Sequence, residues 1–141
     1  MNSFIEELEE RCHRIVRNLK TKSSEPTPVT FIGREIAITL ERIESIRKQQ
    51  KELQEHFTKK ELYCHSQIMN MEHRPSLKNN WQEQNRLTNE FNSILDQAGW
   101  QTRQLISEGE TTLHQLRIRL LELLNMYDQL LPQDGTRKST T

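Results

Sequence analysis

Two short stretches place a cysteine directly before a histidine, and such side chains can bind zinc. They are Cys12–His13 and Cys64–His65, and the chain has no other cysteine. A structural zinc site holds four such ligands about 2.0–2.3 Å from the metal, usually in spaced pairs. Adjacent side chains on a helix point about 100° apart, so neither pair is well placed to chelate an ion. We expect buried cysteines and no metal site, although His114 could approach Cys12.

Motifs of catalysis and nucleotide binding are missing from the sequence. It contains no G-x-S-x-G, no P-loop, no G-x-G-x-x-G and no H-E-x-x-H. The carboxylates of EELEE (6–10) and the remaining histidines fall in charged helical stretches, where a solvated surface is the simpler interpretation. We therefore expect no enzymatic activity, no cofactor and no small-molecule substrate.

The composition favours helices that each bury one apolar stripe, and it does not favour a large globular core. Of 141 residues, 33% are hydrophobic, and 20 basic residues balance 20 acidic ones. A neutral chain with dispersed basic residues gives no electrostatic reason to expect nucleic acid or an anionic membrane as partner. No apolar run approaches the roughly 20 residues of a membrane span. The acidic start does not resemble a signal peptide, so we expect an intracellular protein, cytoplasmic or nuclear.

Apolar periodicity predicts a first amphipathic helix over residues 1–22. Ile5, Leu8, Cys12 and Ile15 follow one another at steps of three and four, as in a coiled-coil seam. Ser3 and Glu6 have the spacing of a capping box. The stretch 23–28 then predicts a linker, in which Thr27 caps the next helix and Pro28 occupies its first turn.

A second, long coiled-coil helix is predicted over residues 27–74, ending before Pro75. Its heptads place two rows of residues in one seam. The first row is Val29, Ile36, Ile43, Gln50, Phe57, Cys64 and Met71, and the second is Ile32, Thr39, Ile46, Leu53, Lys60 and Gln67.

A third, long coiled-coil helix is predicted over residues 76–131, followed by a disordered polar tail over 132–141. Its first part repeats every eleven residues, which favours a nearly straight path. The two series are Phe91–Thr102–Leu113 and Ile94–Leu105–Leu116, and heptads resume after Leu113. Ala98, Gly99 and Gly109 lie in this transition, where small residues either admit a close partner helix or loosen the helix.

The short connection near Pro75 predicts that the two long helices fold back on each other. The expected fold class is all-α: an elongated antiparallel coiled-coil hairpin, with the short N-terminal helix completing a three-helix bundle at one end. Residues 113–131 carry leucines on more than one face, which suits a bundle better than a two-stranded coil. Trp81 and Trp100 lie at the edges of the stripe, so both core packing and partner contact stay open for them.

The stretch CHRIVRNLKTKSSEPTPVTFIGREI (12–36) contains the end of a short predicted helix, an EPTP linker and the start of a long predicted helix. This stretch resembles the N-terminal coiled-coil portions of subunits of the spindle and kinetochore-associated complex. The chain is also similar to small helical subunits of augmin, vesicle-tethering and synaptonemal assemblies. These resemblances imply a subunit of such an assembly and no role for individual residues.

We therefore expect a non-enzymatic coiled-coil subunit of an intracellular complex. This subunit would bind helical protein partners and form a hetero-oligomer with them rather than a homo-oligomer. The complex would be a spindle, kinetochore or other cytoskeletal or chromosome-associated assembly. The alternative is a self-contained three-helix adaptor of the vesicle-tethering or SNARE-regulator type. The seam residues expected to contact partners are Leu105, Leu113, Leu116, Leu120, Leu123, Tyr127, Leu130, Ile36, Ile43, Ile46, Trp81 and Trp100.

Overall fold

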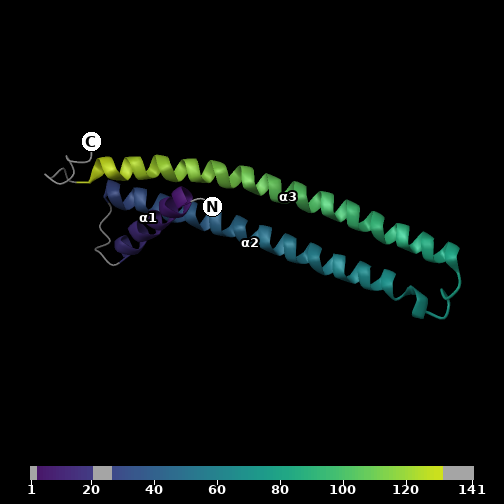
Figure 1. The fold of residues 1–141 in the computed structure, drawn as a ribbon. Coiled ribbons are helices and arrows are strands. Elements are labelled where there is room, and N and C mark those ends of the chain that lie inside the picture. The colour runs from purple at the N-terminus through teal and green to yellow at the C-terminus, as the bar shows by residue number, and fades with distance from the viewer. Residues whose placement is uncertain (1–2, 21–26, 132–141) are drawn as a thin grey trace. The chain divides into compact units, whose positions relative to one another are not determined.

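A computed structural model of the protein describes residues 3–20 and 27–131. These residues form three α-helices, α1 (Ser3–Lys20), α2 (Pro28–Met69) and α3 (Trp81–Leu130), with one short 3-10 helix, η1 (Met71–His73) (Figure 1). No strand occurs within these ranges. The all-α fold class is confirmed. The predicted linker residues 23–26 and the predicted tail 132–141 lie outside the described residues.

The start of α2 agrees with the sequence prediction. The Thr30 N–H donates a hydrogen bond of 3.1 Å to Thr27 Oγ1, and the Phe31 N–H donates one of 2.9 Å to the Thr27 carbonyl. The Thr27 side chain thus satisfies one of the amides that a helix leaves without partners at its N-terminus, and the Thr27 carbonyl accepts the first intrahelical hydrogen bond. Pro28 follows as the first helical residue, where its missing N–H has no cost.

The connection between α2 and α3 is longer than predicted. The second helix was expected to reach residue 74 and the third to begin at Ser76, but α2 ends at Met69 and α3 begins at Trp81. Asn79 has a φ of 65°, which an α-helix does not accommodate. Asn80 then caps α3, because its Oδ1 accepts a 3.2 Å hydrogen bond from the Glu83 N–H.

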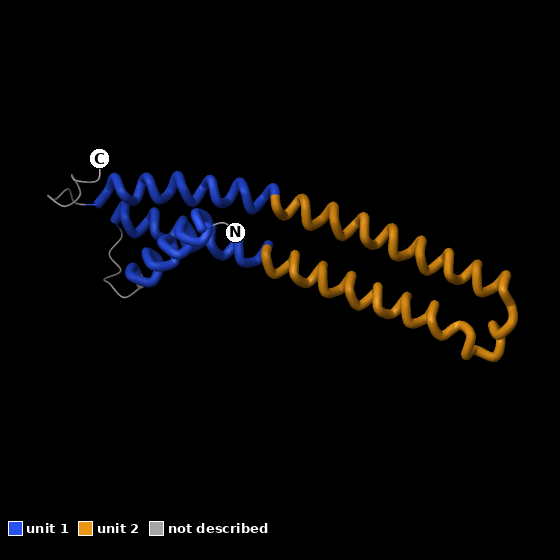
Figure 2. The backbone as a smooth tube through the Cα atoms, viewed as in Figure 1, with its two compact units in different colours: residues 1–46, 111–141 blue, residues 47–110 orange. Residues whose placement is uncertain are grey.

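The described helices pass through two compact units (Figure 2). Unit 1 is formed by Met1–Ile46 and Thr111–Thr141, and unit 2 by Arg47–Glu110.

In unit 1, α1 packs with the first part of α2 and the last part of α3 around one apolar core. The short helix therefore completes a three-helix bundle, as predicted. The buried core residues are Leu8, Cys12, Ile15, Ile32, Ile36, Leu40, Ile43, Leu113, Leu116, Leu120, Leu123 and Leu124.

Two ion pairs also connect α1 to α3 in unit 1. Arg117 Nε donates to Glu9 Oε2 at 3.1 Å, and both side chains are largely buried. Arg11 pairs with Asp128 nearer the end of α3. The carboxylate of Glu9 is thereby paired where burial alone would be unfavourable.

Unit 2 contains two antiparallel helical segments and the turn that joins them. Its buried side chains lie at the turn and near the adjoining helix ends: Cys64, Met71, Leu77 and the polar Gln84. The Gln84 Nε2 donates a 2.7 Å hydrogen bond to the Leu77 carbonyl, so this buried amide has a partner. Away from the turn, the facing side chains of the two segments are only half-buried.

Candidate protein-interaction surfaces

The predicted seam of α2 is correct at every position. All of its heptad residues from Val29 to Met71 are buried or half-buried. One polar member of this seam, Gln50, has partners in unit 2: its Nε2 donates to the Ile106 carbonyl at 3.1 Å and to Glu110 Oε1 at 3.3 Å. Such polar seam contacts help to fix the register of a helix pair.

The predicted seam of α3 is correct in unit 1 except at Leu130, and in unit 2 it is wrong at Ile94 and Leu105. Ile94 and Leu105 were expected to face inward, but they are 46% and 48% exposed. Leu95 and Ile106 take the inward positions. The reason is that half-buried residues follow Ala98 at two successive steps of four, to Thr102 and Ile106. Those steps keep the eleven-residue series Phe91–Thr102–Leu113 on the inward face, while the series through Ile94 and Leu105 lies at the edge of that face.

Most of the residues expected to contact partners lie in the core of unit 1. Ile36, Ile43, Leu113, Leu116, Leu120 and Leu123 are buried there, and Ile46 and Tyr127 pack against them half-buried. These side chains therefore contact one another in this structure instead of forming a surface. Leu130 was also expected in the seam, but it is exposed at the last residue of α3.

Both tryptophans lie on the surface of unit 2. Trp81 is 69% exposed and Trp100 is 58% exposed, so core packing is the wrong interpretation for them. Trp81 is the first residue of α3, and Trp100 lies one turn beyond Asp96. Exposed tryptophans are enriched among residues that anchor protein interfaces.

An apolar flank runs along one side of unit 2. A shallow groove of about 250 Å³ lies there, lined by Lys60, Ile94, Gln97, Ala98 and Gln101. Leu105 follows Ile94 by eleven residues, or about three helical turns, and so lies on the same side of α3. We call these six residues the apolar flank. Its two large apolar side chains are about half exposed, and another helix could bury them.

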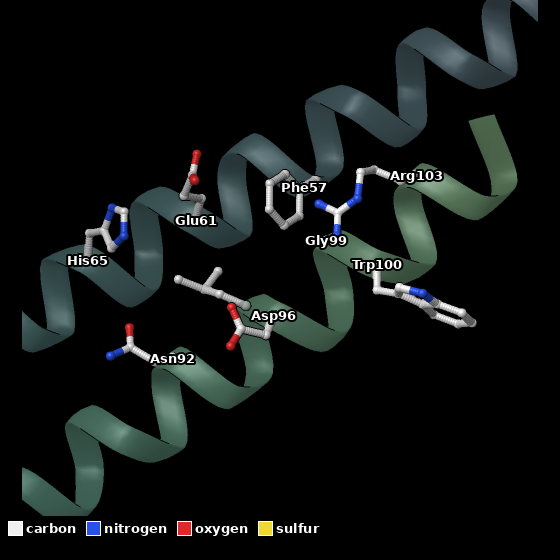
Figure 3. A pocket seen from close by; sticks show the side chains of 9 residues that line it. Phe57, Glu61, His65, Asn92, Asp96, Gly99, Trp100 and Arg103 are labelled. Atoms are coloured by element: carbon white, nitrogen blue, oxygen red, sulfur yellow. The ribbon is translucent and has the colours of Figure 1, made fainter. Parts of the chain in front are cut away.

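A larger groove lies between the two helical segments of unit 2 (Figure 3). Its volume is about 670 Å³, and its lining mixes aromatic, acidic and basic side chains. We call it the charged groove. It is lined by Phe57, Glu61, His65, Asn92, Leu95, Asp96, Gly99, Trp100 and Arg103.

Phe57 of α2 lies close to Gly99 of α3 in the charged groove. A Cβ built on Gly99 would lie 3.5 Å from two ring atoms of Phe57 and 3.4 Å from the Arg103 guanidinium. Phe57 therefore packs against the bare backbone of α3. The small residues of the transition thus admit a helix of the same chain at this position.

The cysteine–histidine pairs do not form a metal centre in the described residues. No group of three His, Cys, Asp or Glu side chains within 3–20 and 27–131 could hold a metal ion. Cys12 is buried in unit 1, while His114 is exposed. Burial raises the pKa of the Cys12 thiol from 9.0 to about 11. The thiol is therefore neutral and packs as a small apolar residue.

The helices of the described residues include none with the long apolar stretch that a membrane span needs.

The charged groove was not predicted from the sequence. Asp96 and Arg103 were not singled out, because single charges on a helix are usually solvated. A signal was present, since two opposite charges seven residues apart flank Gly99 and Trp100 on one side of α3.

Comparison of the chain with protein-family models, with curated proteins and with solved structures found no match.

Proposed function

We propose that this chain is a non-enzymatic helical subunit of an intracellular multi-protein complex and that it binds helical partners through the apolar flank. The observation that carries this proposal is the exposure of Ile94 and Leu105 on one side of α3. A helix that leaves two large aliphatic side chains on one line gains free energy when another helix covers them. Ala98 between them leaves room for close approach.

The proposal moves the binding surface from unit 1 to unit 2. Leu116 and Leu123 already have partners within the bundle of unit 1, so binding there would require the core to open. The apolar flank needs no such opening. The proposed partners are helical subunits of a spindle, kinetochore or other cytoskeletal or chromosome-associated assembly, and the complex is a hetero-oligomer.

The closed core of unit 1 favours a second candidate function, a self-contained three-helix adaptor of the vesicle-tethering type. In that case the purified chain folds alone. Its helicity, measured by circular dichroism, and its melting temperature would then be independent of concentration. A subunit that folds only with its partners would instead lose helicity on dilution.

The apolar flank is tested by quantitative affinity purification of the tagged full chain from cells. The test variant is Ile94→Asp/Leu105→Asp, and the matched control is Ser93→Asp/Gln104→Asp. Each control residue is a neighbour of a test residue, is exposed on the same helix and receives the same charge. We expect the test variant to recover at least tenfold less of each specific partner than the wild type does. The control should recover the same amount as the wild type. Equal recovery with both variants would contradict the proposal.

A further inference from the structure

Two opposite charges in the charged groove lack partners within the described chain. Asp96 and Arg103 both line the groove, and neither makes an ion pair among residues 3–20 and 27–131. They are seven residues apart on α3, which is about two helical turns, so they lie on the same side of the helix. Glu61 adds a second carboxylate to the groove from α2.

The midpoint between these charges is the pair Gly99–Trp100. A two-fold axis that crosses α3 at this midpoint brings Asp96 of one chain opposite Arg103 of another, and the reverse contact forms at the same time. The same axis brings Trp100 opposite Gly99. Phe57 of the same chain already lies against Gly99, so Trp100 of the other copy meets the Phe57 ring at this point.

The charges of α2 agree with the same arrangement. Phe57 lies beside Gly99, and the two segments of unit 2 are antiparallel, so Glu61 lies level with Asp96. An Arg103 placed opposite Asp96 by the two-fold axis therefore also faces Glu61. A guanidinium next to two carboxylates is a favourable ion-pair arrangement, because its fork of donors can serve both.

We propose that the charged groove binds α3 of a second copy of this chain, in the antiparallel orientation, with its centre at Gly99–Trp100. Trp100 of each copy enters the groove of the other beside Phe57, which covers Gly99, and this buries a large aromatic side chain at the middle of the contact. The Asp96–Arg103 pairs on either side fix the register. This homotypic contact uses the face of α3 away from the apolar flank, so it is compatible with a hetero-oligomeric complex.

The symmetry of the contact gives a charge-reversal test on the full chain. Asp96→Arg places arginine opposite arginine in both contacts of a dimer, and Arg103→Asp places aspartate opposite aspartate. Each variant alone should dimerise at least tenfold more weakly than the wild type by analytical ultracentrifugation. An equimolar mixture of the two variants restores both Arg–Asp pairs. We therefore expect heterodimers in the mixture, identified by native mass spectrometry of differently tagged chains.

Several controls keep this inference separate from folding and from the proposed function. Lys59→Asp reverses a charge on an exposed residue of unit 2 outside both grooves, and we expect it to dimerise as the wild type does. Circular dichroism should show the same helicity for all variants. A wild type that stays monomeric at several hundred micromolar, single variants that dimerise normally, or a mixture without heterodimers would each overturn the inference. None of these variants changes Ile94 or Leu105. The affinity purification that tests the proposed function can therefore succeed or fail independently of the dimerisation experiment.

Discussion

Leu120 and Leu121 are neighbours with opposite environments. Leu120 has no exposed surface in the core of unit 1, whereas Leu121 is 37% exposed on the same helix. Truncation of a fully buried leucine costs about 2–5 kcal/mol, because it removes apolar contacts and leaves a cavity. We predict that Leu120→Ala lowers the free energy of unfolding by about 3 kcal/mol in urea titration. Leu121→Ala is the matched control, and an equal loss in the two variants would contradict the core assignment.

Cys12 provides a second prediction at the residue scale, because its thiol is buried and its pKa is raised to about 11. Only the thiolate reacts with iodoacetamide, so burial and the raised pKa both slow the reaction. At pH 8 we expect Cys12 in the folded chain to be alkylated at least about 100-fold more slowly than in the unfolded chain, as two pKa units imply. Mass spectrometry of the Cys12 peptide, with and without urea, measures the ratio.

The sign of the associated stability effect follows from the same pKa. The folded state favours the neutral thiol of Cys12, whose pKa rises from 9.0 to about 11. Its contribution to stability is therefore present below pH 9 and decreases as the pH rises from 9 to 11.

The alkylation experiment has an outcome that contradicts this burial. Similar alkylation rates in the folded and unfolded states at pH 8 would show that Cys12 is outside the core.

At the scale of elements, the first residue of α3 differs between the structure and the sequence prediction: α3 begins at Trp81, and the prediction was Ser76. Asn80 caps the helix through its side chain, while Ser76 lies in the preceding turn. Loss of an N-cap side chain typically costs about 1 kcal/mol. We predict that Asn80→Ala destabilises the chain by about this amount and speeds amide exchange at Glu83. Ser76→Ala should leave both unchanged, and the reverse result would restore the predicted start at Ser76.

The crossing of α1 and α2 in unit 1 depends on Gly33. A Cβ built on this residue would lie 1.9 Å from Leu19 Cδ1, so an alanine requires the Leu19 side chain to move. Against this, alanine in a helix is favoured over glycine by about 1 kcal/mol. We predict that Gly33→Ala is more favourable in a Leu19→Ala background than in the wild type by about 1 kcal/mol. A double-mutant cycle measures this coupling, and additive effects would show that the two residues do not meet.

At the scale of the whole chain, apolar spacing was sufficient to predict the helices and the core of unit 1. Ile36, Ile43, Leu116 and Leu120 repeat at helical steps, and burial follows those steps wherever three helices meet. The heptad pattern also located the seam of α2. These features were predictable because periodicity determines which side of a helix is apolar.

Other features could not be predicted from spacing alone. Ile94 and Leu105 have the same eleven-residue spacing as Phe91 and Thr102, but they lie at the edge of the inward face and remain about half exposed. The third helix was predicted to start at Ser76, but the positive φ of Asn79 interrupts the helix and α3 begins at Trp81. The exposure of Trp81 and Trp100 depends on how few helices unit 2 contains, which no local pattern records.

The most direct test of the central claim is site-specific photo-crosslinking in cells, with a benzophenone amino acid at position 94 or at position 104. Position 94 lies in the apolar flank, and position 104 is exposed outside it on the same helix. The proposed function predicts a discrete adduct with a helical protein from position 94 and none from position 104. No adduct from position 94, or the same adducts from both positions, would contradict it.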